Sequence, residues 1–148
     1  MKKVIIALVL FALIITFTGC SSSTSTSSGI TFEELGYFKK PNDIGGYIRV
    51  KTIYVSNFRD DPQVWQEIES YGKREMWEKG GFTCVFFFND RNYTPADGVT
   101  LAKDFDEATK FSDIPGVEQY CVAGYWHYAN GEENFIKYPP LSTKGMMD

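Results

Sequence analysis

The chain has 148 residues, a net charge of −4 and 16% aromatic residues. An acidic chain gains nothing from releasing counterions at phosphates, so this balance argues against a nucleic-acid partner. The length suffices for one hydrophobic core and is too short for two domains once a leader is set aside.

The first predicted element is a lipoprotein signal peptide over residues 1–19. Lys2-Lys3 precedes the apolar run Val4–Ile15, which is shorter than the about 20 residues that a membrane-spanning helix needs. The run leads to Thr18-Gly19-Cys20, which resembles the lipobox of bacterial lipoproteins. This resemblance implies cleavage directly before Cys20, acyl chains such as palmitate on its thiol, and a place outside the cytoplasm on the cell membrane or outer membrane. An uncleaved anchor helix is the alternative.

A tether follows the predicted lipidation site. Residues 21–29 consist of Ser, Thr and Gly only, and such a stretch cannot bury enough surface to offset its chain entropy. We therefore predict a lipidated tether over residues 20–29 and a single globular domain over residues 30–148. The partners that this arrangement implies are the membrane, reached through acyl chains on Cys20, and an envelope protein or glycan.

The first half of the domain reads as helix, strand, helix. The spacing of Thr31 and Glu34 is that of a capping box and predicts a short helix. The alternation of side chains between two faces over Tyr47–Val55 predicts a strand. Asp60-Asp61-Pro62 predicts a helix start with an acid as cap, and the helix is expected to end at Gly80-Gly81.

The second half is richer in strands. Phe82–Phe88 has no polar alternation, which predicts a central strand buried on both faces. Apolar spacing from Leu101 to Phe111 predicts a second helix. Val117–Tyr128 predicts a long strand, and Asn130-Gly131 predicts the turn to a returning strand over Asn134–Tyr138.

These elements predict an α/β or α+β fold. We expect a mixed sheet of about four strands, with one long helix and one or two short helices packed on it, and a C-terminal β-hairpin.

No catalytic signature is present, and we expect no catalytic residue, no cofactor and no metal site. The G-x-S-x-G, H-E-x-x-H, phosphate-loop, dinucleotide and C-x-x-C patterns are all missing. His127 is the single histidine, and in an aromatic strand it is more often a packed residue than a base. The acids of Asp104–Glu107 are interpreted as a solvated helix face. For Cys84 and Cys121 the sequence leaves open either a disulfide or two buried free thiols.

A polar constellation is the first candidate site. If the strands Tyr47–Val55 and Phe82–Phe88 are parallel, their carboxyl ends meet at one edge of the sheet, where open α/β sheets bind ligands. The side chains expected there include Asn57, Asp60, Asp90 and Arg91. Turn and cap formation is the competing explanation for these residue types.

An aromatic surface is the second candidate. Tyr120, Trp126 and Tyr128 fall on one face of the predicted strand Val117–Tyr128. Such a face stacks on sugars, anchors a protein partner, or forms core under a helix.

Two segments, Phe86–Arg91 and Gly124–Gly131, resemble those of small bacterial domains of unknown function, which implies no activity. The leading hypothesis is a membrane-anchored envelope lipoprotein that works as a non-catalytic binding domain. The alternatives are a small envelope hydrolase or polar-ligand site built on Asn57, Asp60, Asp90 and Arg91, and a structural lipoprotein that stabilises a larger assembly.

Overall fold

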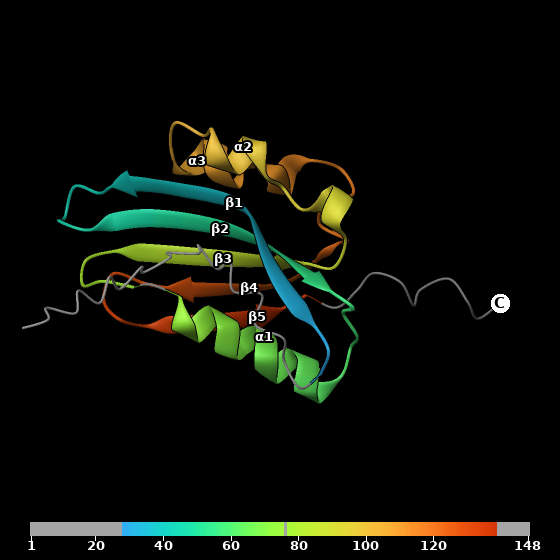
Figure 1. The fold of residues 1–148 in the computed structure, drawn as a ribbon. Coiled ribbons are helices and arrows are strands. Elements are labelled where there is room, and N and C mark those ends of the chain that lie inside the picture. Colours follow the sequence, from blue (N-terminus) through green and yellow to red (C-terminus); the bar gives the residue numbers. More distant parts are fainter. Residues whose placement is uncertain (1–27, 76, 139–148) are drawn as a thin grey trace, which may run out of the picture.

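The computed structural model describes residues 28–75 and 77–138 (Figure 1). The signal peptide, Cys20, the tether up to residue 27 and the segment 139–148 lie outside the described residues. Ser28 falls within the predicted tether, yet it is buried and its hydroxyl donates to Glu67 at 2.6 Å. The described fold therefore begins two residues before the predicted domain boundary.

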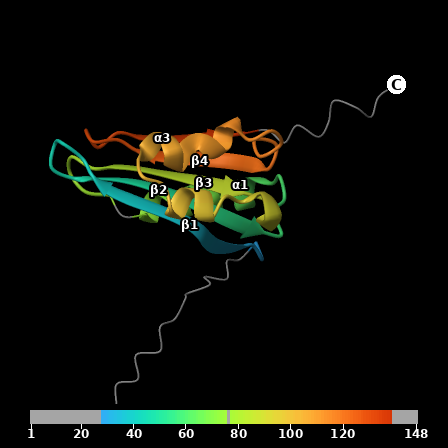
Figure 2. The same ribbon diagram turned by 90° about the horizontal axis from the view of Figure 1, so that it is seen from above.

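The described residues form a mixed five-stranded sheet with helices on both faces. The strand order is β1-β2-β3-β4-β5, in which β2 and β3 are parallel and every other neighbouring pair is antiparallel. Figure 1 shows α1 and the α2–α3 pair on opposite sides of the sheet, and the view from above shows α2 and α3 in front of the strands (Figure 2). In chain order the elements are β1 (Thr31–Pro41), β2 (Tyr47–Ser56), α1 (Pro62–Arg74), β3 (Phe82–Phe88), η1 (Arg91–Tyr93), α2 (Asp97–Thr100), α3 (Phe105–Thr109), η2 (Lys110–Asp113), β4 (Cys121–His127) and β5 (Glu133–Lys137).

The α+β architecture with a mixed sheet is confirmed, and the prediction of about four strands is corrected to five. The extra strand is β1, where the spacing of Thr31 and Glu34 predicted a helix. Pairing with β2 supplies the backbone hydrogen bonds that a helix would have made internally. A register shift between Glu34 and Gly36 also turns the strand, so Phe32 joins the core on one face of the sheet and Phe38 the core on the other.

Helix α1 connects the parallel strands β2 and β3, as expected. Its cap is Asp61, whose carboxylate accepts the Val64 N–H at 2.9 Å, and Pro62 occupies the first turn. The helix ends at Arg74, earlier than the predicted end at Gly80-Gly81.

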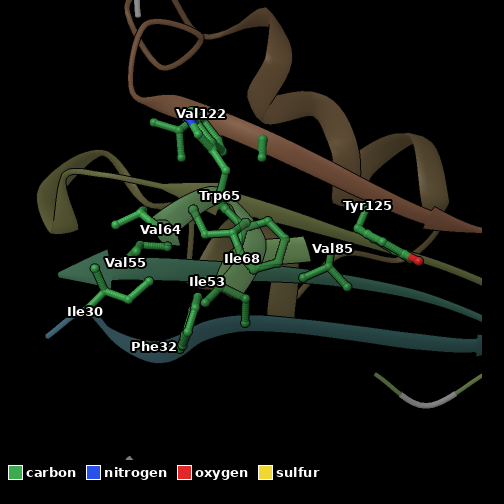
Figure 3. Close-up of a cluster of buried hydrophobic side chains, with 12 residues drawn as sticks. Ile30, Phe32, Ile53, Val55, Val64, Trp65, Ile68, Val85, Val122 and Tyr125 are labelled. Carbon is green, nitrogen blue, oxygen red and sulfur yellow. The ribbon is translucent and has the colours of Figure 1, made fainter. Parts of the chain in front are cut away.

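The central position of β3 is confirmed, because it has a neighbour on each side and its residues feed two cores. The first core packs α1 residues Val64, Trp65 and Ile68 against the sheet (Figure 3). The second core lies on the opposite face and includes Val50, Cys84, Val99 and Phe111.

The segment predicted as one helix over Leu101–Phe111 is broken. Leu101 ends α2 and is 76% exposed. Asp104 then caps α3 by accepting the Glu107 N–H at 2.8 Å. A local side-chain hydrogen bond therefore restarts the helix within a run whose apolar spacing suggested continuity.

The predicted strand from Val117 is shorter than expected. The Tyr120 N–H donates to the Val117 carbonyl at 3.0 Å, which makes a turn, and β4 begins at Cys121. The predicted hairpin is confirmed, since Tyr128 N–H donates to Glu132 O at 2.8 Å and Gly131 has a φ of 91°.

Replacing Gly72 with alanine tests the packing of α1 on the sheet. A Cβ at Gly72 would lie 2.5 Å from the Tyr125 ring, and such overpacking costs about 1–3 kcal/mol. We expect a lower urea midpoint, measured by tryptophan fluorescence. Gly98→Ala is the matched control, because a Cβ there meets open space within α2 and should be neutral or stabilising by up to about 1 kcal/mol. Equal midpoints for the two variants would contradict the packing described.

Candidate functional site

The parallel pairing of β2 and β3 does bring their carboxyl ends to one edge of the sheet, with Tyr54 opposite Phe88. Asn57 follows β2 with a φ of 52°, in the left-handed region that asparagine tolerates better than most residues. Its amide donates to the Gly29 carbonyl at 3.3 Å. Asn57 is thus engaged with the segment that leads into β1.

The other three polar residues at this edge also have local partners. Asp60 accepts the Trp65 indole N–H at 2.6 Å. Asp90 caps η1 by accepting the Asn92 N–H at 2.9 Å. Arg91 makes a two-point ion pair with Glu33 of β1, at 2.6 and 3.2 Å. The pocket described below is lined by other residues.

The three predicted surface aromatics lie on the face of the sheet that carries the second core. Trp126 packs edge-on against Phe86, with ring centroids 5.7 Å apart. Tyr120 precedes β4 and stacks on Tyr93 at 4.0 Å. Tyr128 follows β4, contacts Phe82 and is 37% exposed. Two of the three rings thus cover the second core, and Tyr128 is the most accessible.

A pocket of about 360 Å³ adjoins this aromatic surface. Its interior is apolar, and two polar side chains, Ser112 and Glu118, are exposed at its rim. Phe86 links the pocket to Trp126. The lining residues are Phe86, Phe111, Ser112, Val117, Glu118, Cys121 and Tyr138.

Unequal helix cover explains why the pocket lies here. On this face α2 contacts β1 and α3 contacts β2, whereas the β3–β4 part of the sheet is covered by η2 and the turns before β4. The indole of Trp126 lies next to Gly124, where any Cβ would collide with it. The glycine lets the indole cover the strand without a helix above it.

The two cysteines are free thiols, which resolves the alternatives that the sequence left open. Cys84 is paired with Trp126 and Cys121 with Phe88, so the cysteines lie roughly 13 Å apart along the ladder. A disulfide needs Cα atoms within about 7 Å. Cys84 is fully buried, whereas Cys121 is partly accessible and lines the pocket. Burial raises the pKa of the Cys121 thiol to about 12.

Charged groups on the α1 face serve the fold. Arg49 is 2% exposed and pairs with Glu78 at 2.9 Å, while its Nε and Nη1 atoms have no hydrogen-bond partner among the residues that the structure describes. Burial by itself lowers the pKa of Lys51, but its hydrogen bonds and ion pairs with Glu34 and Glu75 raise it to about 12. Two strand cations are thus held between β1, β2 and the segment after α1.

His127 is packed in place. It is 5% exposed, its Nε2 lies 3.2 Å from the Gly72 carbonyl, and its Nδ1 lies 3.3 Å from Glu133. A base needs access to the proton it abstracts, so this position suits a structural role.

Within residues 28–75 and 77–138, no group of three or more His, Cys, Asp and Glu side chains could hold a metal ion. In the same part of the chain, no helix has the length and apolar character needed to cross a bilayer. No protein-family model, curated protein or solved structure matches this chain.

The sequence did not point to the pocket. Phe111 lies in η2, Val117 in a turn and Tyr138 beyond the end of β5, so the three residues share no period, although Phe111 belongs to the apolar spacing that predicted a helix. One local signal was available in the sequence. Gly124 lies two residues before Trp126 on the same face of the strand, so the Trp126 ring can cover a position that has no side chain.

The reactivity of Cys121 tests its position in the pocket wall. Because only the thiolate reacts, its alkylation rate should rise on the order of tenfold per unit from about pH 8 to about pH 10, without a plateau near the ordinary thiol pKa of about 8.5. The rate is read by peptide mass spectrometry. Cys84 serves as the internal control, since its burial should keep it unmodified. A plateau at about pH 8.5, the ordinary thiol value, would show that the thiol is not buried in this way.

Proposed function

We propose that this chain is a membrane-anchored lipoprotein of the bacterial cell envelope whose domain binds a small, largely apolar molecule without catalysis. The observation that carries the binding part of the proposal is the pocket of about 360 Å³ beside the aromatic surface. Its size falls in the range of small-molecule sites, which are mostly apolar with a few polar groups that set orientation.

The pocket wall favours a ligand with a flat or aliphatic body. Phe86, Phe111 and Tyr138 offer ring faces and edges, and Val117 adds an aliphatic wall. Glu118 at the rim favours a hydrogen-bond donor or a positive charge on the ligand's exposed end. The ligand class is therefore an apolar molecule that carries an amine or another donor.

The absence of catalysis is supported by the placement of the polar groups. His127 is packed between α1 and β5, and Asp60 and Asp90 are engaged in local hydrogen bonds. The pocket itself contains one carboxylate and one thiol, and that thiol has a raised pKa. A thiol held neutral is a poor nucleophile.

The anchor is supported by the sequence of residues 1–29. A short apolar run, a small residue before Cys20 and an uncharged tether together indicate lipidation rather than a spanning helix. Several acyl chains would hold the chain firmly, since each buried CH₂ contributes about 0.8 kcal/mol.

Cys20→Ser tests the anchor. We expect the variant to incorporate no labelled fatty acid and to shift from the membrane fraction to the soluble or precursor fraction, because the thiol is the acylation site. Ser21→Cys on the Cys20→Ser background is the matched control, since it restores a thiol one position away. Unchanged acylation in Cys20→Ser would rule out Cys20 as the lipidated residue.

Protection of Cys121 tests the ligand class. In membranes that carry the full chain, 2-naphthylmethylamine should slow alkylation of Cys121, at about fivefold lower concentration than 2-naphthoate because of the Glu118 carboxylate at the rim. Ser112→Trp should abolish the protection by filling the pocket mouth.

Ser70→Trp is the control for that experiment, because Ser70 is exposed on α1, on the opposite face of the sheet. It should leave the protection unchanged. Equal potency of the amine and the carboxylate would contradict the role of Glu118, and failure of both to protect Cys121 would contradict the pocket as a binding site.

A further inference from the structure

Within the described residues, no strand pairs with the outer edge of β5. The Tyr128 N–H donates to Glu132 O and the Tyr138 N–H to Val122 O, both at 2.8 Å, and these pairs flank the β4–β5 ladder. The backbone N–H and C=O groups of successive residues point alternately to the two sides of a strand. Those of Glu133, Phe135 and Lys137 therefore point away from β4. In the part of the chain that the structure describes, no hydrogen bond occupies these outward groups.

The opposite edge of the sheet is protected. On β1 the outward N–H of Tyr37 donates to the Thr100 hydroxyl at 3.2 Å, so α2 blocks the middle of the strand. Pro41 has no N–H to offer, and Lys39-Lys40 places two like charges there. These are the usual devices against edge-to-edge pairing. β5 is also short and charged, but the strand contains no proline and its two charges, Glu133 and Lys137, are of opposite sign.

The charges of β5 are self-complementary. In an antiparallel pair of two β5 strands with Phe135 opposite Phe135, Glu133 of each copy lies opposite Lys137 of the other. This register also brings the outward groups of the two strands face to face as hydrogen-bonded pairs. If one β5 strand slid past the other by two hydrogen-bonded residue pairs, Glu133 would face Glu133, or Lys137 would face Lys137, depending on the direction. These like charges would repel each other.

Apolar surface near the two-fold axis is consistent with the same register. Phe135 is partly buried against the first core and would meet its own copy on the α1 face. Ile136 is 40% exposed on the other face and would be covered by the second copy. The two faces of the joined strands would thus each lose exposed apolar area.

We propose that β5 is a homodimer interface, at which two copies of this chain pair antiparallel about Phe135 to form one continuous ten-stranded sheet. The two-fold axis makes the contact isologous, so it closes at two copies and does not propagate into fibres. The proposal is independent of the ligand in the pocket and of the lipid anchor.

The mass of the full chain in a non-ionic detergent, measured by sedimentation across the micromolar range, tests the interface. We expect a monomer–dimer equilibrium. Lys137→Glu should weaken it on the order of tenfold, because two attractive cross-strand pairs become repulsive. Lys79→Glu makes the same change of charge on an exposed residue outside the strands and should leave the equilibrium unchanged.

Mixing Lys137→Glu with Glu133→Lys provides the register test. In a dimer of either variant alone, residues of like charge face each other at positions 133 and 137. In a dimer that contains one copy of each variant, Lys faces Glu at both contacts, so mixing the two variants should restore dimers. If Glu133→Lys loses its fold, because Glu133 also accepts a hydrogen bond from the Tyr125 hydroxyl, then Lys137→Pro, measured without a mixing partner, tests the edge in place of the register. Lys137→Pro removes one N–H that points away from β4 and makes no hydrogen bond to it. The variant should therefore weaken the dimer.

Three results would overturn the proposal: a monomer at every concentration, dimers as strong in Lys137→Glu as in the unaltered chain, or no heterodimer from two folded charge variants.

Discussion

The parallel pairing of β2 with β3 is the constraint on which the rest of the fold depends. Two parallel strands require a crossover, and α1 supplies it across one face of the sheet. Because β3 is buried on both faces, the opposite face also needs a cover, and α2, α3 and the turns before β4 provide it. The two hydrophobic cores follow from this one arrangement.

The helices that cover the two faces of the sheet differ in size. The features with a proposed function lie where the smaller cover, formed by α2 and α3, ends. Helix α1 has 13 residues, whereas α2 and α3 have 4 and 5. The short helices lie mainly over β1 and β2 and protect one edge of the sheet, whereas η2 and the turns before β4 cover most of β3 and β4. The apolar pocket, the accessible Tyr128 and the open edge of β5 all lie on this less covered side. Ligand binding in the pocket and pairing of two chains at β5 are thus both compatible with the unequal helix cover of the sheet.

Polar residues at the carboxyl ends of β2 and β3 illustrate how fold and function compete for the same side chains. The parallel pairing that the topological argument assumed is present, and both strands end at one edge of the sheet. Yet Asp90 caps η1, Arg91 pairs with Glu33, and Asp60 holds the Trp65 indole. Turn and cap formation uses short polar side chains locally and accounts for Asp90, whereas Asp60 is held by a side-chain hydrogen bond and Arg91 by an ion pair with β1.

Local and strongly periodic features were determined by the sequence itself. The run of β3 without polar alternation, the proline start of α1 and the Asn130-Gly131 hairpin each rest on residues a few positions apart, so one sequence window contains the whole cause. Tertiary structure alone decided the rest. Residues Thr31–Pro41 became a strand because β2 offered a partner and both cores had room for a phenylalanine. The pocket and the open edge depend on which strands lack a helix above them or a neighbour beside them, and such absences are set by distant segments that no single window contains.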